Sequence, residues 1–162
     1  MNELSWFVAH TRPRCEKKLV GWCQREGLQT TLPRYHTVHK YRGKVVRFEK
    51  PLFPGYVFLH LADGRQRFVA QNDYVARVLV VHDQQVFENQ LSDILQALEA
   101  ASEIQVVPEI GEGSRVRVKH GPLRGMEGWV EKRYGMTTVL FRLDFIGQAA
   151  AVKLEAWELE PA

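Results

Sequence analysis

The chain has 162 residues, of which 45% are hydrophobic and 25% are charged, and its formal net charge is +3. This composition is typical of a soluble globular protein, and the length suffices for one ordinary domain or two small ones. No apolar run approaches the roughly 20 residues that span a membrane. The first residues also lack the basic region and apolar stretch of a secretory signal, so we expect a cytoplasmic protein without membrane association.

Positive charge is concentrated in the first half of the chain. Between His10 and Lys50, eleven Lys or Arg residues stand against three acids, which leaves a balance of +8. Residues 101–162 hold eight bases and nine acids, a balance of −1. The asymmetry predicts a polyanionic partner for the first half, while a merely solvated basic surface is the alternative.

The first elements alternate between strand and helix patterns. Ser5–Thr11 alternates as a half-buried strand does, and a helix is expected over about Arg14 to Glu26. The apolar stripe of this helix is formed by Cys15, Leu19, Trp22 and Cys23. Two extended arms then meet near Arg42–Gly43–Lys44, which predicts a hairpin rich in bases.

The elements that follow complete an α+β unit. Tyr56–Leu61 predicts a further strand, and Asp63 is expected to cap a short helix that carries Phe68 and Val69. Ala76–Val81 has little polarity and suits the centre of a sheet. Apolar residues from Phe87 to Ala101 recur at helical spacing. We predict one mainly antiparallel sheet with helices packed on it.

A second, smaller domain is predicted after a linker. The stretch from Ala101 to Gly113 shows no sustained period and contains Pro108, Gly111 and Gly113. Short strand-like runs separated by turns follow, which suggests a small SH3-like five-stranded β-barrel. The expected domains are therefore residues 1–101 and 114–162, joined by a linker at 102–113.

The sequence offers no catalytic or cofactor motif. It lacks the G-x-S-x-G, H-E-x-x-H and C-x-x-C patterns and a phosphate-binding glycine loop with its lysine. Gly121, Gly125 and Gly128 precede a strand and are interpreted as barrel turns. Cys15 and Cys23 are too far apart on one helix to bridge and are interpreted as core thiols. We expect a binding protein without metal or cofactor.

Two motifs carry a family resemblance. The stretch "PLFPGYVF", which follows the strand, helix and basic hairpin, resembles the N-terminal domain of the NusG family of transcription elongation factors. The stretch "GSRVRVKHGPLRGMEGWVEK", Gly113 to Lys132, resembles the KOW motif of the same family, and "GQAAAVKLEAWELE" is similar to its end. The resemblance covers about Ser5 to Glu160, in the family's order.

The resemblance implies a binding surface for RNA polymerase. In this family an aromatic face binds the tip of the clamp helices of the largest polymerase subunit. Aromatic side chains suit this role because they give a large contact area at low entropy cost. The positions that correspond here are Trp6, Phe53, Pro54, Tyr56 and Phe58. A role in the core alone is the alternative, above all for Trp6 and Phe58.

The resemblance also implies contact with upstream or non-template DNA. Cations would bind phosphates without reading sequence. The candidates are Arg12, Arg14, Lys17 and Lys18 at the first helix, and Arg42, Lys44 and Arg47 on the hairpin. Tyr41, His36 and His39 are candidates for stacking on a base, as in the sequence-selective RfaH-like members of the family.

The C-terminal module has further expected partners. In general NusG proteins it contacts the termination factor Rho and a small-subunit ribosomal protein through an isoleucine–phenylalanine–glycine loop. Here the loop reads Phe145–Ile146–Gly147, with the two apolar residues exchanged. Neighbours on a strand point to opposite faces, so this exchange weakens the expectation of both partners and, with the short chain, favours a specialised paralogue.

Two alternatives remain at this point. The stretch Gln148 to Glu160 is rich in helix formers, as in the RfaH domain that folds as a helical hairpin, although its KOW frame demands a strand. We expect the barrel to be the resting state. The protein as a whole is predicted to be a monomeric, non-enzymatic elongation or antitermination factor. A KOW-type protein that binds RNA or the ribosome is the alternative.

Overall fold

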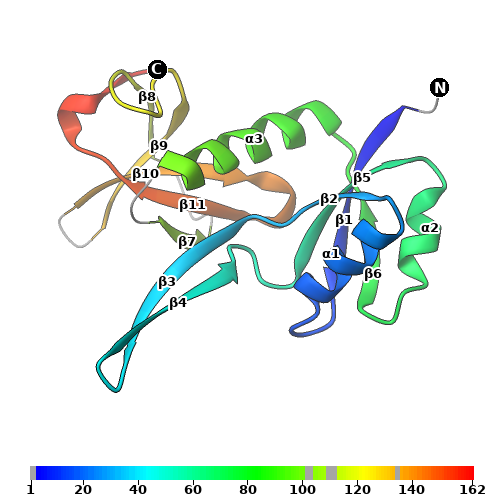
Figure 1. The fold of residues 1–162 in the computed structure, drawn as a ribbon. Helices are drawn as coiled ribbons and strands as arrows, with labels where there is room; N and C mark the ends of the chain where they lie inside the picture. Colours follow the sequence, from blue (N-terminus) through cyan, green and yellow to red (C-terminus); the bar gives the residue numbers. More distant parts are fainter. Residues whose placement is uncertain (1–2, 101–103, 109–112, 134–135) are drawn as a thin grey trace. The chain divides into compact units, whose positions relative to one another are not determined.

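The structure is a computed structural model and describes residues 3–100, 104–108, 113–133 and 136–162 (Figure 1). The chain forms two compact units, Met1–Gln84 and Gln85–Ala162. This division groups the helix that ends at Ala100 with the second unit. The family resemblance assigns that helix to the first domain, and the boundary at residue 101 stays a prediction. Among the described residues, no helix is both long and apolar enough to cross a membrane.

The first unit is built on a four-stranded antiparallel sheet. Its strands are β1 (Leu4–Thr11), β2 (Gln29–Thr31), β5 (Tyr56–Ala62) and β6 (Val75–Val80), in the order β2-β5-β1-β6. The predicted strands at Ser5–Thr11 and Tyr56–Leu61 are confirmed and lie side by side. The central position predicted for Ala76–Val81 is wrong, because within the described part of the chain β6 pairs only with β1 and ends the sheet. Low polarity was a poor guide here, since the side chain of Val80 is 53% exposed.

Two helices, α1 (Glu16–Arg25) and α2 (Arg65–Ala70), cover one face of this sheet. Their apolar side chains pack with alternate residues of β1 and β5. The core consists of Phe7, Ala9, Leu19, Val20, Cys23, Val57, Leu59, Leu61, Val69 and Val75. The predicted first helix is thus confirmed, with Leu19 and Cys23 fully buried, whereas Cys15 remains partly exposed.

The start of α2 differs from the prediction. The N-cap is Gly64, with φ of 97°, rather than Asp63. Gln66 serves this helix end instead: its side-chain oxygen accepts a hydrogen bond of 2.6 Å from the Gly64 amide, and its nitrogen donates one of 3.1 Å to Asp63. Asp63 is therefore not the cap itself. It orients Gln66, whose side chain satisfies the Gly64 amide.

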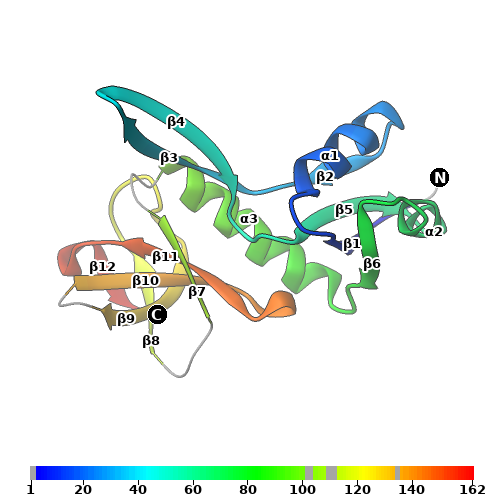
Figure 2. The same cartoon turned by 90° about the horizontal axis from the view of Figure 1, so that it is seen from below.

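The basic segment forms the expected hairpin, which leaves the four-stranded sheet as a separate two-stranded arm (Figures 1 and 2). Its strands are β3 (Arg34–Tyr41) and β4 (Lys44–Pro51), paired antiparallel along their whole length. Arg42 and Gly43 form the two-residue turn, and both have positive φ, 47° and 79°. This is the pattern of a type I′ turn, whose twist matches that of paired strands.

The second unit contains α3 (Gln84–Ala100) and a six-stranded antiparallel sheet. The strands are β7 (Ile104–Pro108), β8 (Ser114–Val118), β9 (Glu127–Arg133), β10 (Met136–Leu143), β11 (Gln148–Lys153) and β12 (Leu159–Pro161). Two short 3-10 turns, Asp144–Ile146 and Ala156–Glu158, precede β11 and β12.

This sheet departs from the predicted closed, five-stranded barrel. Its order is β12-β8-β9-β10-β11-β7, with β12 and β7 as separate ends among the described residues. The sixth strand comes from the predicted linker, of which residues 101–103 and 109–112 lie outside the described part. Ile104–Pro108 was predicted to be irregular, but it pairs with β11 over five residues. Its strand character came from a partner distant in sequence, which no local period reveals.

The stretch near the C-terminus that is rich in helix-forming residues contains the strands β11 and β12. β11 pairs with β10 on one side and with β7 on the other, and Ala149 and Ala150 are fully buried. Small side chains fit here because Ala149 and Ala151 pack with Leu140 beside Trp129. Burial and pairing on both edges therefore outweigh a helix preference of a few tenths of a kcal/mol per residue.

Candidate functional site

The face of the first sheet opposite the helices carries a row of rings. Trp6, Val8 and His10 of β1 lie directly across from His60, Phe58 and Tyr56 of β5. Trp6 stacks on His60 with ring centroids 4.3 Å apart and planes inclined by 14°. His10 stacks on Tyr56 at 5.3 Å and 25°. We call the six residues of these three pairs the aromatic sheet face.

The ends of the aromatic sheet face are half-exposed, and its middle is buried. Trp6, His10, Tyr56 and His60 are all partly accessible. Val8 and Phe58, between them, are fully covered. Two stacked pairs thus flank a covered apolar centre, and the partly accessible rings of these pairs are the part of the face that can meet apolar side chains of a partner at low entropy cost.

The FPGY motif forms the turn that leads into β5. The amide of Tyr56 donates to the carbonyl of Phe53 at 3.3 Å, and Gly55 has φ of 88°. Proline at the second position and a positive φ at the third are the signature of a type II turn. The density of unusual residues in this motif is therefore explained in part by local folding.

One candidate is placed differently from the prediction. Phe53 was expected to be a surface residue, but its side chain is only 1% exposed and its ring lies 6.3 Å from that of Phe58. The turn sets the two rings side by side, so that Phe53 supports Phe58, in the middle of the aromatic sheet face, from within. Pro54 is exposed and Tyr56 is half-exposed, as a contact role requires.

Sequence reasoning missed the two histidines of the aromatic sheet face. Neither His60 nor His10 was among the expected contact residues. A signal was present, because residues two apart on a strand share a face, which links His60 to Phe58 and His10 to Val8. What the sequence alone does not provide is the register that stacks each histidine on an aromatic ring.

Gln84 holds the end of β1 where β6 no longer pairs with it. The Trp6 amide donates to the Gln84 side-chain oxygen at 2.5 Å, and the Gln84 nitrogen donates to the Trp6 carbonyl at 2.9 Å. The same nitrogen donates to the Val81 carbonyl at 2.7 Å. The side-chain amide replaces a strand partner and fixes the backbone that carries the Trp6 ring.

The first group of cations lies beside the FPGY turn. The Thr11 amide donates to the Gly55 carbonyl at 2.8 Å, so the chain after β1 runs along this turn. Arg12 to Cys15 forms a second turn, closed by a 3.1 Å bond from the Cys15 amide to the Arg12 carbonyl. Arg14, at its third position, has φ of 63°, where glycine is the usual residue. The exposed Arg12 and Arg14 are thus held at the Tyr56 end of the aromatic sheet face.

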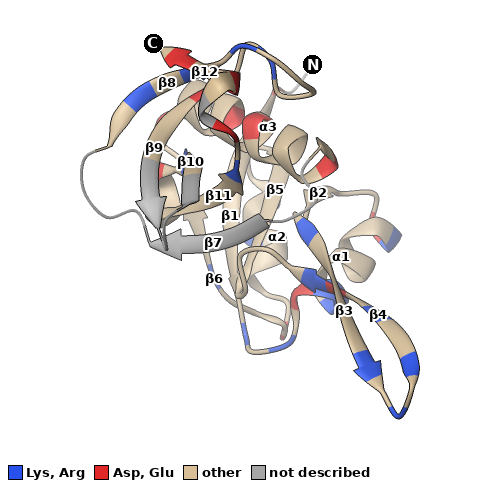
Figure 3. Cartoon of the chain, turned by 90° about the vertical axis from the view of Figure 1, so that its left-hand side faces the viewer, with Lys and Arg blue, Asp and Glu red and all other residues tan. Residues whose placement is uncertain are grey.

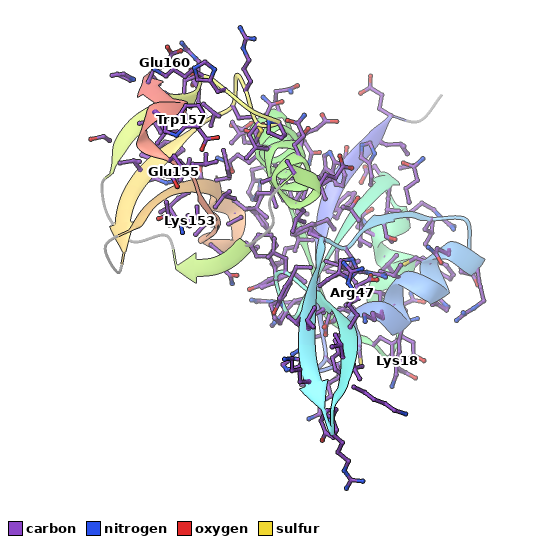
Figure 4. The ribbon with its side chains drawn as sticks, turned by 60° about the vertical axis from the view of Figure 1, so that its left-hand side comes forward. Lys18, Arg47, Lys153, Glu155, Trp157 and Glu160 are labelled. Carbon is purple, nitrogen blue, oxygen red and sulfur yellow. The ribbon has the colours of Figure 1, made fainter. Side chains whose placement is uncertain are left out.

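Within the first group of cations, Arg12, Lys17 and Lys18 also make contacts that hold the first unit together. Arg12 donates from Nε to the Asp73 carbonyl at 3.0 Å. Lys17 donates from Nζ to the Glu49 carbonyl at 2.6 Å, which ties α1 to the base of the hairpin. Lys18 approaches the Tyr74 ring, with Nζ 6.0 Å from its centroid. Figure 4 labels Lys18 on α1 and Arg47 on the hairpin.

The hairpin carries the second group of cations, Arg42, Lys44 and Arg47, all of them exposed (Figure 3). Its one acid, Glu49, is paired with Arg34 at 2.8 Å. The hydrogen bond from Arg34 lowers the pKa of Glu49, and the charges of Arg34, His36 and Lys17 lower it further. Because this carboxylate is already engaged, the other hairpin cations are available to an external anion.

The candidate loop of the second unit is not a strand. Phe145 and Ile146 lie in the 3-10 turn Asp144–Ile146, and both side chains are half-buried, so the prediction that they point to opposite faces of a strand is wrong. The ring of Phe145 meets that of Phe87 on α3 edge to face, 6.1 Å apart. Gln90 and Asp144 form two hydrogen bonds of 2.9 Å. The side-chain nitrogen of Gln90 donates to the Asp144 carboxylate, and the backbone amide of Asp144 donates to the side-chain oxygen of Gln90.

Comparison with known proteins identifies the family to which the chain belongs. The family model described as transcription termination factor nusG matches residues 4–109. Among solved structures, the chain is similar to Thermotoga maritima NusG, studied for its domain interaction, with 18% identity and a TM-score of 0.49 over 98% of this chain and 97% of that one. It is also similar to an MjSpt4:Spt5 complex, with 14% identity and a TM-score of 0.32 over 97% and 96%.

None of the curated proteins matches the chain. Both TM-scores are below 0.5, so the family assignment depends on the sequence match. That match covers more than half of the 162 residues and includes both strands of the aromatic sheet face and the whole hairpin. The chain therefore belongs to the NusG family of transcription elongation factors.

Proposed function

We propose that this protein is a non-enzymatic elongation or antitermination factor that binds the clamp helices of the largest RNA polymerase subunit through its aromatic sheet face. The observation that carries this proposal is the pair of ring stacks, Trp6 on His60 and His10 on Tyr56, on the face of the sheet opposite α1 and α2. A helical tip presents apolar side chains at intervals, and flat rings on rigid strands accept them with little loss of entropy.

The cations provide a second contact, with upstream or non-template DNA. Arg12 and Arg14 lie beside the FPGY turn, and Arg42, Lys44 and Arg47 lie along the hairpin. Contacts of this kind bind phosphates and give affinity without sequence preference. A protein that binds polymerase and DNA together stabilises the closed clamp, and this shift of population disfavours pausing.

The second unit is the proposed site for a further partner. Phe145 and Ile146 offer apolar surface on the turn before β11. The two candidate partners are a small-subunit ribosomal protein and Rho, and the exchanged order of the two apolar residues bears on both of them alike. The contacts of Phe145 with Phe87 and of Asp144 with Gln90 have to open for either partner to reach the whole loop.

Retention on core polymerase without nucleic acid tests the proposal. The full-length chain should bind, and Tyr56→Ala should weaken binding. Val80→Ser is the matched control. Val80 is exposed on the same sheet, but it pairs with Phe7 and therefore lies on the face opposite the aromatic sheet face. Equal binding by all three proteins would contradict the aromatic sheet face as the polymerase site.

A KOW-type RNA- or ribosome-binding protein is the second candidate function. The exposed rings Tyr41 and Phe48 among the hairpin cations favour it, since RNA-binding surfaces combine such groups. The same retention experiment separates the two functions. Core polymerase without nucleic acid retains the chain only under the first proposal, whereas ribosomes or RNA retain it under the second.

A further inference from the structure

Trp157 of the second unit is 65% exposed, whereas the other three tryptophans are half-buried. It lies in the 3-10 turn Ala156–Glu158, between β11 and β12. The turn closes without the indole: the Glu158 amide donates to the Glu155 carbonyl at 3.0 Å, and the Glu155 amide donates to the Glu158 carboxylate at 2.9 Å. A tryptophan that its own turn does not need is a candidate partner contact, because tryptophan is enriched among the residues that dominate binding energy.

The surface around this ring is built from two segments that are tied together. The Lys119 amide donates to the Glu158 carbonyl at 2.7 Å, which joins the loop after β8 to the turn. In that loop the ring of His120 meets the Trp157 ring, with centroids 5.6 Å apart and planes inclined by 42°. We call Trp157, His120 and Glu155 the tryptophan patch. Its position on a hydrogen-bonded turn means that little order has to be gained when a partner binds.

The charge beside Trp157 is negative. Residues 154–162 contain three glutamates and no Lys or Arg. Among the described residues, the Glu155 carboxylate has no ion-pair partner, and Glu160 lies 3.7 Å from Arg117, at the outer limit of an ion pair. Figure 4 labels Lys153, Glu155, Trp157 and Glu160 in this order along the end of the second unit, so that carboxylates flank the ring.

This charge narrows the choice of partner. Carboxylates beside the ring repel phosphate groups, which disfavours nucleic acids and anionic lipids. They attract a cation, and the face of an indole is the aromatic surface that holds a cation best. The complementary partner is therefore a basic side chain of another protein.

The second unit itself shows that arginine suits such a surface. The guanidinium carbon of Arg115 lies 5.7 Å from the centroid of the Trp129 ring, and the same side chain pairs with Glu127 at 2.7 Å. Arg142 approaches the Trp129 ring to 3.8 Å. A planar guanidinium can lie on a ring and donate hydrogen bonds to a carboxylate at once, which an ammonium group does less well. No described arginine lies over Trp157, so an arginine at this ring has to come from a partner.

We propose that the tryptophan patch binds an arginine side chain from a basic segment of a partner protein. The guanidinium stacks on the Trp157 indole and pairs with the Glu155 carboxylate. This contact is separate from the aromatic sheet face, from the hairpin and from the turn of Phe145 and Ile146. It gives the second unit a further protein-docking surface, with a stated chemistry.

Two matched double variants of the full-length chain test the proposal, with fluorescently labelled hexa-arginine as the probe. Trp157→Ala with Glu155→Gln alters the tryptophan patch. Phe48→Ala with Glu88→Gln removes an exposed ring and an exposed carboxylate elsewhere, with the same change of net charge. Fluorescence anisotropy should show binding weakened about fivefold or more in the first variant and within about twofold of the unaltered protein in the second.

Further variants and peptides separate stacking from charge attraction. Trp157→Phe keeps a ring and should bind hexa-arginine more tightly than Trp157→Ala does. Hexa-lysine has the same charge but should bind the unaltered protein more weakly than hexa-arginine, and uncharged hexa-citrulline should bind least. Circular dichroism checks that each variant remains folded, as the exposure of Trp157 leads us to expect.

Nuclear magnetic resonance locates the contact. Hexa-arginine should shift the indole N–H signal of Trp157 saturably and leave that of Trp129 in place. Equal losses in the two double variants, hexa-lysine binding as tightly as hexa-arginine, or an unmoved Trp157 signal would each overturn the proposal. A shift of Trp157 by oligothymidylate and none by hexa-arginine would make nucleic acid the occupant, and the proposal would fail in that case too.

Discussion

His10 and Tyr56 stack as cross-strand neighbours, with ring centroids 5.3 Å apart, although 46 positions separate them in the chain. The FPGY turn lies beside this contact. Gly55 lies next to the His10 ring, and a β-carbon at position 55 would sit 3.6 Å from it. The same turn accepts the hydrogen bond from Thr11 that places Arg12 and Arg14 nearby. Candidate polymerase contacts and candidate DNA contacts are thereby joined at one end of the sheet.

Phe53 and Tyr56 should respond differently to alanine. Phe53 is buried against Phe58, so Phe53→Ala is expected to lower the free energy of unfolding by about 3–5 kcal/mol. Tyr56 is half-exposed, and Tyr56→Ala should weaken polymerase binding by roughly 1–3 kcal/mol with a smaller effect on stability. Urea denaturation and binding to a clamp-helix fragment measure the two effects. Equal losses of stability would contradict the burial of Phe53.

Reversal of charge on the hairpin should act on DNA binding alone. With Arg42, Lys44 and Arg47 replaced by Glu, binding to an assembled elongation complex should weaken and depend less on salt, because fewer counterions are released. Binding to the isolated clamp-helix fragment should change little. A titration of both targets at several salt concentrations measures this, and equal losses on the two targets would show that the hairpin is not a DNA contact.

The tip of the hairpin should tolerate glycine and reject a β-branched residue. Arg42 has φ of 47°, a region that costs a residue with a β-carbon about 1–2 kcal/mol and glycine nothing. Arg42→Gly is expected to protect the hairpin amides against hydrogen exchange at least as well as Arg42 does. Arg42→Val should protect them less. If valine protects as well as glycine, the type I′ turn is not maintained in solution.

The thiol of Cys23 predicts a dependence of stability on pH. Burial raises the pKa of Cys23 from 9.0 to about 11, so the folded state holds this proton more tightly than the unfolded state does. The stabilisation is complete below pH 9 and is lost as the pH rises toward 11. Urea denaturation at pH 8 and at pH 10.5 should show a larger drop in stability for the wild type than for Cys23→Ala. The partly exposed Cys15 should also be alkylated before Cys23.

The segment from Gln148 to Lys153 should be a strand in the full-length free protein. It pairs with β10 and β7, and Ala149 to Ala151 are buried there. Carbon chemical shifts of these residues are therefore expected to be strand-like, both before and after cleavage of the chain near Pro108. Helical shifts that disappear on cleavage would instead indicate an autoinhibited helical hairpin.

The sequence by itself determined the elements whose signals are local. Helical spacing placed α1 and α3, the residues around Arg42 and Gly43 placed the hairpin, and the FPGY motif marked the start of β5. These predictions succeed because turn chemistry and amphipathic periodicity depend on neighbouring residues. The same motif led to the family that the sequence match confirms.

Only the tertiary structure decided which residues meet. The burial of Phe53, the stacks formed by His10 and His60, the edge position of β6 and the sixth strand from the predicted linker all depend on pairing between distant segments. The register of strand pairing also depends on segments that are distant in the chain. It brings His39 of β3 beside Phe48 of β4, because the pairing decides which residues of the two strands are neighbours. A single sequence shows which residues of a strand share a face, but it does not show which strand pairs with it or which of its two faces is covered.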